Sequence, residues 1–399
     1  MCEGCNVSCG NWSKKRKSFG FKWKNLLHLI LVATLVGAWF YGRFNSLPDY
    51  GALLQGQMKK VSVMETKQDD YYQIVEDSGE ESVVLLSEGK GYGGPFTMAT
   101  WIGQDSLIRD VFVLENRETP SFFKKLKDRS FFYQFKRKAI GDKFSGGEDV
   151  DFISGATVSS RAFTKAIKIA SYQAGKEKFN MSLEEVDDGY RMGWKEFIVL
   201  LLVVLSIGAT YKPDKRVRMA IQMVSLVFLG FAYNAALSVS GFSSLMLGFF
   251  PSVKEHMAWW ILMGGSLAAV VFLTRNIYCS YLCPFHGIET LLNKISGINL
   301  KLSAKVQKIA GQTSLYLLWG ALVLIFLNSN PTHASYEPFA MIFSLEGVGM
   351  QWYILPATLV GAFFMKDFFC KFFCPVGQTF TLLIKWRQKL AKRFKGGQI

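Results

Sequence analysis

Six apolar stretches constrain the fold of this chain more than any other feature of its 399 residues. Each is almost free of charge, and a helix of about 17 to 20 such residues can cross the roughly 30 Å hydrocarbon core of a bilayer. The stretches run approximately over residues 25–41, 197–211, 219–239, 257–274, 311–328 and 351–365. They predict a polytopic α-helical membrane protein with about six transmembrane helices.

Basic residues alternate between the loops that join these stretches. Lys and Arg cluster before the first stretch and after the second, fourth and sixth. The two intervening loops, Ser240–His256 and Ser329–Met350, together contain one basic residue, Lys254. The positive-inside rule therefore predicts that both termini are cytoplasmic. The formal charge of +15 is thus explained by the membrane, and no nucleic acid partner is expected.

A soluble segment separates the first two stretches. It contains β-rich runs such as Ser82–Leu86 and Phe96–Ile102, and it has no cysteine, which suits an exported α+β domain. The first stretch lacks a small-residue cleavage site and is expected to stay as an anchor. The predicted division is a cytoplasmic, Cys-containing basic N-terminus (1–24), a transmembrane anchor (25–44), an extracytoplasmic FMN-binding domain (45–194), a five-helix membrane domain (195–384) and a basic cytoplasmic tail (385–399).

The assignment of the soluble segment rests on Asp151–Thr157, which reads D-x-x-S-G-A-T. This motif resembles the FMN-binding domain of Na⁺-pumping and Rnf-type respiratory complexes. The resemblance implies that a flavin transferase joins the FMN phosphate to Thr157 as a phosphoester. It also implies that the other motif residues, Asp151, Ser154, Gly155 and Ala156, belong to the cofactor site.

The residues around Thr157 suit this role physically. Gly155 and Ala156 leave room for a phosphate to approach the backbone. Phe163, Ile167 and Ala170 recur with helical spacing, so Thr157 should lie just ahead of a helix N-terminus, which attracts anions. The alternative is an ordinary loop with Ser or Thr helix caps.

Two further segments resemble the same domain. They are Gly89–Pro95, before one β-rich run, and Glu118–Pro120, after another. Gly89, Gly91 and Gly94 satisfy G-x-G-x-x-G, but a strand and not a helix is expected next, which excludes a dinucleotide-binding fold. We expect Gly91 and Gly93 to form a turn beside the isoalloxazine ring, with Glu118 and Thr119 as further contacts.

The seven cysteines all lie on segments predicted to be cytoplasmic and reducing, which favours metal or redox roles over disulfides. Cys279, Cys283, Cys370 and Cys374 form two C-x-x-x-C-P motifs, each at a predicted helix end near the membrane surface. They could bind an iron–sulfur cluster or another thiolate-bound metal, or they could be small buried residues.

Other cysteine-related features are less specific. Cys2, Cys5 and Cys9 offer three ligands without an obvious fourth, so a cluster and no metal both remain open. His286 either completes a metal site or is a packed side chain. No C-x-x-C-x-x-C-x-x-x-C-P run is present, so no ferredoxin module is expected.

The combination of an exported FMN domain, further spans and two C-x-x-x-C-P motifs resembles the NosR-like family of membrane flavoproteins. The short chain is more similar to the subgroup encoded with reductive dehalogenases (PceC/RdhC type). This resemblance implies organohalide respiration, with electrons passing from quinol through FMN to an extracytoplasmic reductase. It implies an electron-transfer component without catalytic residues of its own, rather than a stand-alone enzyme.

Other functions remain open. The chain could be a maturation or redox-sensing regulatory membrane protein for such a reductase, or, less well supported, a transporter with a flavin domain attached. The predicted topology also poses a difficulty, because it puts the cysteine motifs and the flavin on opposite faces of a core about 30 Å thick.

Overall fold

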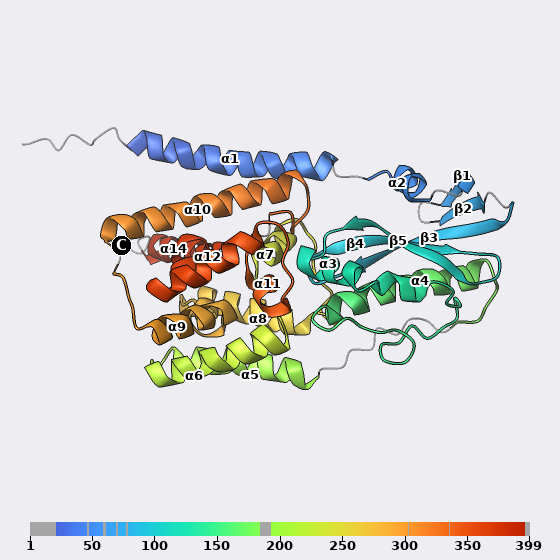
Figure 1. Cartoon of the computed structure of the whole chain (residues 1–399). Helices are drawn as coiled ribbons and strands as arrows, with labels where there is room; N and C mark the ends of the chain where they lie inside the picture. Colours follow the sequence, from blue (N-terminus) through green and yellow to red (C-terminus); the bar gives the residue numbers. More distant parts are fainter. Residues whose placement is uncertain are drawn as a thin grey trace, which may run out of the picture.

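The computed structural model describes residues 21–45, 48–58, 61–68, 71–76, 79–183, 193–301, 303–334 and 336–395. Cys2, Cys5 and Cys9 lie outside these ranges. The described chain is largely helical, with one small sheet between the first two apolar stretches, as predicted. Figure 1 shows the sheet domain at one end of the helical part, with α1 (Phe21–Asn45) running along the helical part towards it.

The sheet is an antiparallel meander in which the spatial order of the strands follows the sequence. Residues of β3 alternate between its two faces, and both faces are covered, so a continuous apolar run is buried. Helix α4 (Thr157–Glu177) packs on one face, where Phe163 and Ile167 are fully buried. Leu54 of α2 (Tyr50–Gln57) is buried on the other. The strands are β1 (Val61–Gln68), β2 (Tyr71–Glu76), β3 (Glu81–Lys90), β4 (Pro95–Ile102) and β5 (Ile108–Asn116).

These elements position the segments expected to hold the flavin. The glycines lie in the hairpin turn between β3 and β4, and a strand follows them, as predicted. Glu118 and Thr119 connect β5 to α3 (Pro120–Asp128), and a short 3₁₀ helix, η1 (Phe131–Phe135), follows. The predicted helix after the D-x-x-S-G-A-T motif is present as α4, which begins at Thr157 itself.

Two described helices are long and apolar enough to cross a membrane: Leu26–Asn45 and Ala304–Leu327. The other predicted spans correspond to shorter helices, two of which pass from α-helical into π-helical geometry. The helical elements are α1, α5 (Trp194–Ala209), α6 (Lys215–Ser225) with η2 (Leu226–Ala232), α7 (Val239–Met246), α8 (Met257–Ala268) with η3 (Ala269–Leu273), η4 (Tyr278–Leu282), α9 (Pro284–Ser296), α10 (Ala304–Leu327), α11 (Phe339–Ser344), α12 (Gln351–Phe364), α13 (Phe368–Phe372) and α14 (Pro375–Lys395).

Two of these helices begin inside the helical part. Pro284 and Pro375 are the first residues of α9 and α14, a position where proline is favoured because its missing N–H has no partner to lose. Ser314, near the middle of α10, donates a hydrogen bond to the Cys374 carbonyl (3.2 Å). Cys374 is therefore packed against the middle of α10 in the protein interior. The prolines do end the preceding segments, and each also begins a new helix.

Candidate flavin and metal sites

Thr157 is exposed at the start of α4, and its hydroxyl points back towards the Ile153 carbonyl (3.5 Å). Gly155, also exposed, has a φ of +79°, and a Cβ added there would lie 3.0 Å from Lys125 Nζ. Ser154 is exposed and Ala156 is buried. Thr157 therefore stands at a helix N-terminus two residues after a glycine, and the Lys125 ammonium group lies beside that glycine, a set of groups that fits a phosphoester.

Asp151 contributes to this loop through its backbone. Its side chain is exposed, whereas its backbone is held on both sides by Gln134. The Asp151 N–H donates to Gln134 Oε1 (2.8 Å), and the Asp151 carbonyl accepts from Gln134 Nε2 (3.2 Å). The structure therefore shows Asp151 at the corner that leads the chain into the attachment loop.

The glycine turn is held by the buried carboxylate of Glu118. Oε2 accepts from the Tyr92 N–H (2.8 Å), and Oε1 accepts from the Gly93 and Thr119 N–H groups (both 2.7 Å). A Cβ at Gly91 would collide with this carboxylate, and one at Gly93 would collide with the Thr119 backbone. The structure thus brings Gly91, Gly93, Glu118 and Thr119 into one compact unit.

Burial raises the pKa of the Glu118 carboxyl, and the three backbone N–H groups oppose this shift. The hydroxyl of Ser159, in the first turn of α4, lies close to this carboxylate. Ser121 Oγ, at the start of α3, is buried without a hydrogen-bond partner among the described residues. An unsatisfied polar atom at this junction is consistent with a polar ligand.

Two spaces adjoin the Glu118–Pro120 segment. A groove of about 540 Å³ follows Glu118, Pro120 and Phe123 along α3, and its size admits an isoalloxazine ring. A second cavity, of about 30 Å³, lies between Thr119 and Glu337 of the helical part. Its size suits water and not a flavin. Of the two spaces, the open groove is the one large enough for the ring, and of the predicted cofactor contacts it is lined by Glu118.

The sheet domain is docked on the helical part through Tyr92. Its hydroxyl donates to the Ala236 carbonyl (3.1 Å), and the next N–H, that of Leu237, donates to the Tyr278 hydroxyl (2.8 Å). Tyr278 immediately precedes Cys279. The glycine turn and the first C-x-x-x-C-P motif are therefore joined by a short chain of contacts, whereas the sequence led us to expect the flavin and the cysteines on opposite faces of a core about 30 Å thick.

The four cysteines form a core of free thiols. Cys283 and Cys374 are buried, and Cys279 and Cys370 are partly buried. A Cβ added at Gly377 would lie 3.6 Å from Cys374 Sγ and 3.9 Å from Cys279 Sγ, so the two motifs meet there. The Gly377 N–H also donates to Cys374 Sγ (3.3 Å).

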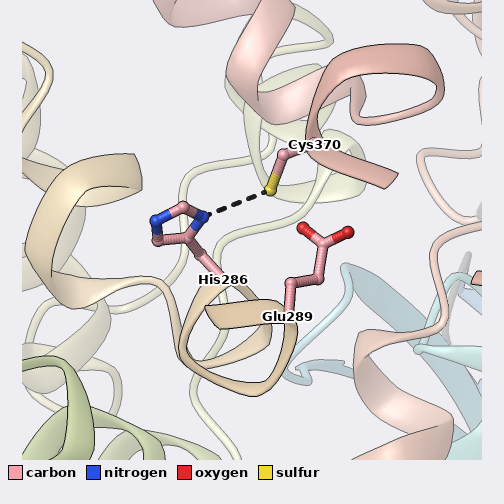
Figure 2. Close-up of side chains that lie close together, drawn as sticks. All are labelled: His286, Glu289 and Cys370. Carbon is pink, nitrogen blue, oxygen red and sulfur yellow. Dashed lines mark hydrogen bonds between the residues drawn. The ribbon is translucent and has the colours of Figure 1, made fainter. Parts of the chain in front are cut away.

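The remaining cysteine faces α9. Cys370 Sγ lies 3.7 Å from His286 Nδ1, and Figure 2 shows both residues next to Glu289. The ligand atoms of these three residues lie within 4.8 Å of one another. Glu289 was not identified from the sequence, although its spacing of three residues from His286 puts both on one helix face.

The donor set of this core fits an iron–sulfur centre. Four thiols converge in the interior, with an imidazole and a carboxylate beside them. The first turns of α9 and α14 follow directly after Cys283 and Cys374, so their N–H groups and dipoles favour thiolates. Such a centre would be held by Cys279, Cys283, Cys370 and Cys374.

Comparisons with known families agree with both sites. Residues 91–171 match the FMN-binding domain family. Residues 255–303 and 352–393 match a 4Fe-4S binding domain, and each of these stretches contains one C-x-x-x-C-P motif.

The chain is also similar to several known proteins. It is 26% identical over 196 residues to Protein NirI of Paracoccus denitrificans, covering 45% of this chain and 29% of that protein. It is 24% identical over 213 residues to the Regulatory protein NosR of Pseudomonas aeruginosa, covering 48% and 29%. It is 30% identical over 110 residues to one component of the proton-translocating ferredoxin:NAD(+) oxidoreductase complex of Clostridium ljungdahlii, covering 26% and 59%.

The chain thus spans 29% of the length of NirI and of NosR. Along this chain, a match to the FMN-binding domain family and a match to a 4Fe-4S binding domain occur together. These similarities support a flavoprotein with FMN and an iron–sulfur centre that is similar in part to NirI and NosR.

Proposed function

We propose that this chain is a membrane-bound electron-transfer flavoprotein, which passes electrons from quinol through covalent FMN on Thr157 to an extracytoplasmic reductase. The observation that carries the proposal is the short connection between the two sites. The glycine turn, which Glu118 binds, contacts the helical part through Tyr92, whose hydroxyl donates to the Ala236 carbonyl. The N–H of the next residue, Leu237, donates to the Tyr278 hydroxyl, and Tyr278 directly precedes Cys279. A flavin beside the glycine turn and a metal centre at the cysteines would be close enough to exchange electrons.

When bound, FMN accepts two electrons from a quinol and can release them singly. The residues of this chain then have distinct roles. The Thr157 hydroxyl would retain the cofactor outside the cell, and Lys125 would balance phosphate charge. Glu118 keeps the glycine turn in one conformation by binding three of its neighbouring N–H groups.

The proposed topology has six spans, cytoplasmic termini and an extracytoplasmic FMN domain. The alternation of basic loops supports it, and so do the two helices long enough to span a bilayer. The proposed domain limits remain 25–44 for the anchor, 45–194 for the FMN domain and 195–384 for the membrane domain. A reductive dehalogenase is the proposed partner, on the basis of the resemblance to the PceC/RdhC subgroup.

A second candidate function is the maturation or redox-dependent regulation of such a reductase. The name of one relative, Regulatory protein NosR, favours it. The two functions differ in turnover. An electron-transfer protein has flavin that quinol reduces and a partner reoxidises repeatedly, whereas a regulator needs only one redox change.

The attachment of FMN is tested by Thr157→Ala. The chain is co-expressed with a flavin transferase, and flavin fluorescence is measured in the protein band of a denaturing gel. We expect fluorescence in the wild type and none in the variant, because the phosphoester requires the hydroxyl. Thr313→Ala is the matched control, since the Thr313 hydroxyl also contacts the carbonyl four residues earlier in the chain. A dark wild-type band would contradict the proposal.

A further inference from the structure

A cavity of about 190 Å³ lies at the junction of the sheet domain and the helical part. One wall is the glycine turn, including Tyr92 and Gly93, and Arg117 lies beside it. The opposite wall is aromatic and contains Phe249 and Trp259. The Arg117 guanidinium lies over the Phe249 ring, 4.6 Å from its centroid, and closes one side of the cavity.

This cavity and the candidate flavin groove share a thin wall. The N–H groups of Tyr92 and Gly93 point towards Glu118, on the flavin side. The Gly93 carbonyl accepts a hydrogen bond from Ser244 of α7, which lines the cavity. The turn has little side-chain bulk, so its backbone and the Glu118 carboxylate are what lies between the cavity and the groove. A ligand in the cavity would therefore lie close to a flavin ring in the groove beside Glu118.

The size and lining of the cavity restrict its ligand. Sites for drug-sized ligands are typically about 300 to 1,000 Å³, so 190 Å³ suits one substituted ring and excludes a flavin or nucleotide. The walls combine aromatic rings with two carboxylates, Glu88 and Glu115. Phe250, which lines the cavity, and its neighbours Met246 and Val253 are exposed apolar residues, so the surroundings of the cavity suit a hydrocarbon tail.

We propose that this cavity binds the ring of a membrane quinol and brings it to the back of the glycine turn. This inference rests on the proposed electron-transfer function and gives the electron donor a place. Oxidation of the quinol breaks its two O–H bonds and yields a quinone, two protons and two electrons. A flavin beyond the turn would be the oxidant that accepts the electrons. Glu88 accepts the protons in turn, and its exposed position allows their release to water, while Glu115 is ion-paired with Arg117.

The site is tested with a substitution that fills the cavity. Gly241 of α7 lines it, and Gly241→Leu would place an apolar side chain where the ring binds. Gly264→Leu is the matched control, because Gly264 also lies in an apolar helix but has open space around its Cβ position. Phe250→Ala is a second variant that should fold, since Phe250 is 56% exposed.

Equilibrium binding of menadione and of a short-chain benzoquinone is measured on the full-length chain in detergent. We expect at least tenfold weaker binding for Gly241→Leu, a smaller loss for Phe250→Ala and wild-type binding for Gly264→Leu. Flavin content from gel fluorescence should be the same in all. Wild-type binding in Gly241→Leu and Phe250→Ala, or no binding by the wild type itself, would overturn the site.

Flavin reduction separates this site from the proposed function. The rate of flavin reduction by menadiol is compared with reduction by dithionite, which needs no quinol site. Gly241→Leu should lose the menadiol reaction and keep the dithionite reaction. A different outcome is that the wild type binds quinone, Gly241→Leu prevents this binding, and menadiol still does not reduce the wild-type flavin. The quinone site would then stand, and the proposed electron-transfer function would fail.

Discussion

The two halves of the cysteine core have the same geometry and different chemistry. In each half a cysteine precedes a proline that starts a helix, α9 or α14. The third residue after that cysteine faces the first cysteine of the other motif. In the first half this residue is His286, which faces Cys370, and in the second it is Gly377, which faces Cys279.

The sixth residue after the second cysteine differs as well. In α9 it is Glu289, which accepts a hydrogen bond from the Phe369 N–H (2.6 Å) in the second half. In α14 it is Phe380, which is fully buried and packs against Tyr278, with ring centroids 6.0 Å apart. The repeat thus places its cysteines in the same way in both halves. The first half adds polar contacts through His286 and Glu289, whereas the second adds a glycine and an apolar ring, Gly377 and Phe380. This difference makes the two sides of a bound centre unequal.

The largest expected effect comes from removing a buried thiol. Cys283→Ser and Cys374→Ser should each abolish bound iron, because a serine hydroxyl is a poor substitute for a thiolate ligand. Iron and acid-labile sulfide per chain are the measurements. The two variants should be equivalent if one centre uses both halves. Loss in one variant alone would show that only that half binds metal.

Gly377 is predicted to be nearly as sensitive. Gly377→Leu would place a side chain between the sulfurs of Cys374 and Cys279, so we expect most of the iron to be lost although all four thiols remain. Gly320→Leu in α10, where nothing lies within 4 Å of the Cβ position, is the control. Normal iron content in Gly377→Leu would show that no metal bridges the halves at this point.

The two sixth positions should differ in how they stabilise the chain. Phe380→Ala should cost about 3–5 kcal/mol, the usual loss for a buried aromatic side chain. Glu289→Ala should cost about 1–3 kcal/mol, because it leaves the buried Phe369 N–H without its acceptor. Glu289→Gln, which keeps an acceptor oxygen, should cost less. Thermal unfolding in detergent with iron chelated measures all three, and a larger loss for Glu289→Ala than for Phe380→Ala would contradict this comparison.

Much of the sheet domain could be predicted from the sequence because its signals are local. The β-rich runs became β3 and β4, the glycines became their turn, and the spacing of Phe163 and Ile167 identified α4. The contact between the glycine turn and Glu118 joins residues more than twenty positions apart in the chain. The family resemblance put both segments near the flavin, but no local pattern predicts their contact with each other.

The helical part was predicted less completely because charge patterns report the side of a loop and not its depth. They could not show that Cys283 and Cys374 lie in the interior. Changes from α-helical to π-helical geometry at Leu226 and Ala269 shift the side chains within stretches whose apolar composition alone does not mark them. The role of Tyr278 depends on such long-range packing, and no local pattern identifies it.

The smallest expected effect concerns the tyrosines that tie each half to its surroundings. Tyr278→Phe removes the acceptor of the buried Leu237 N–H, and Tyr336→Phe removes the donor to the Phe373 carbonyl (2.6 Å). A buried N–H without an acceptor is tolerated less well than a buried carbonyl that lacks one of its donors. Tyr278→Phe should therefore lower stability by about 1 kcal/mol or slightly more, and Tyr336→Phe by less. Thermal unfolding gives the order of the two losses. Tyr278→Phe should also increase hydrogen exchange at Leu237, because its N–H loses the acceptor, while exchange near Tyr336 stays unchanged. Equal exchange at Leu237 in Tyr278→Phe and the wild type would show that this connection does not depend on the Tyr278 hydroxyl.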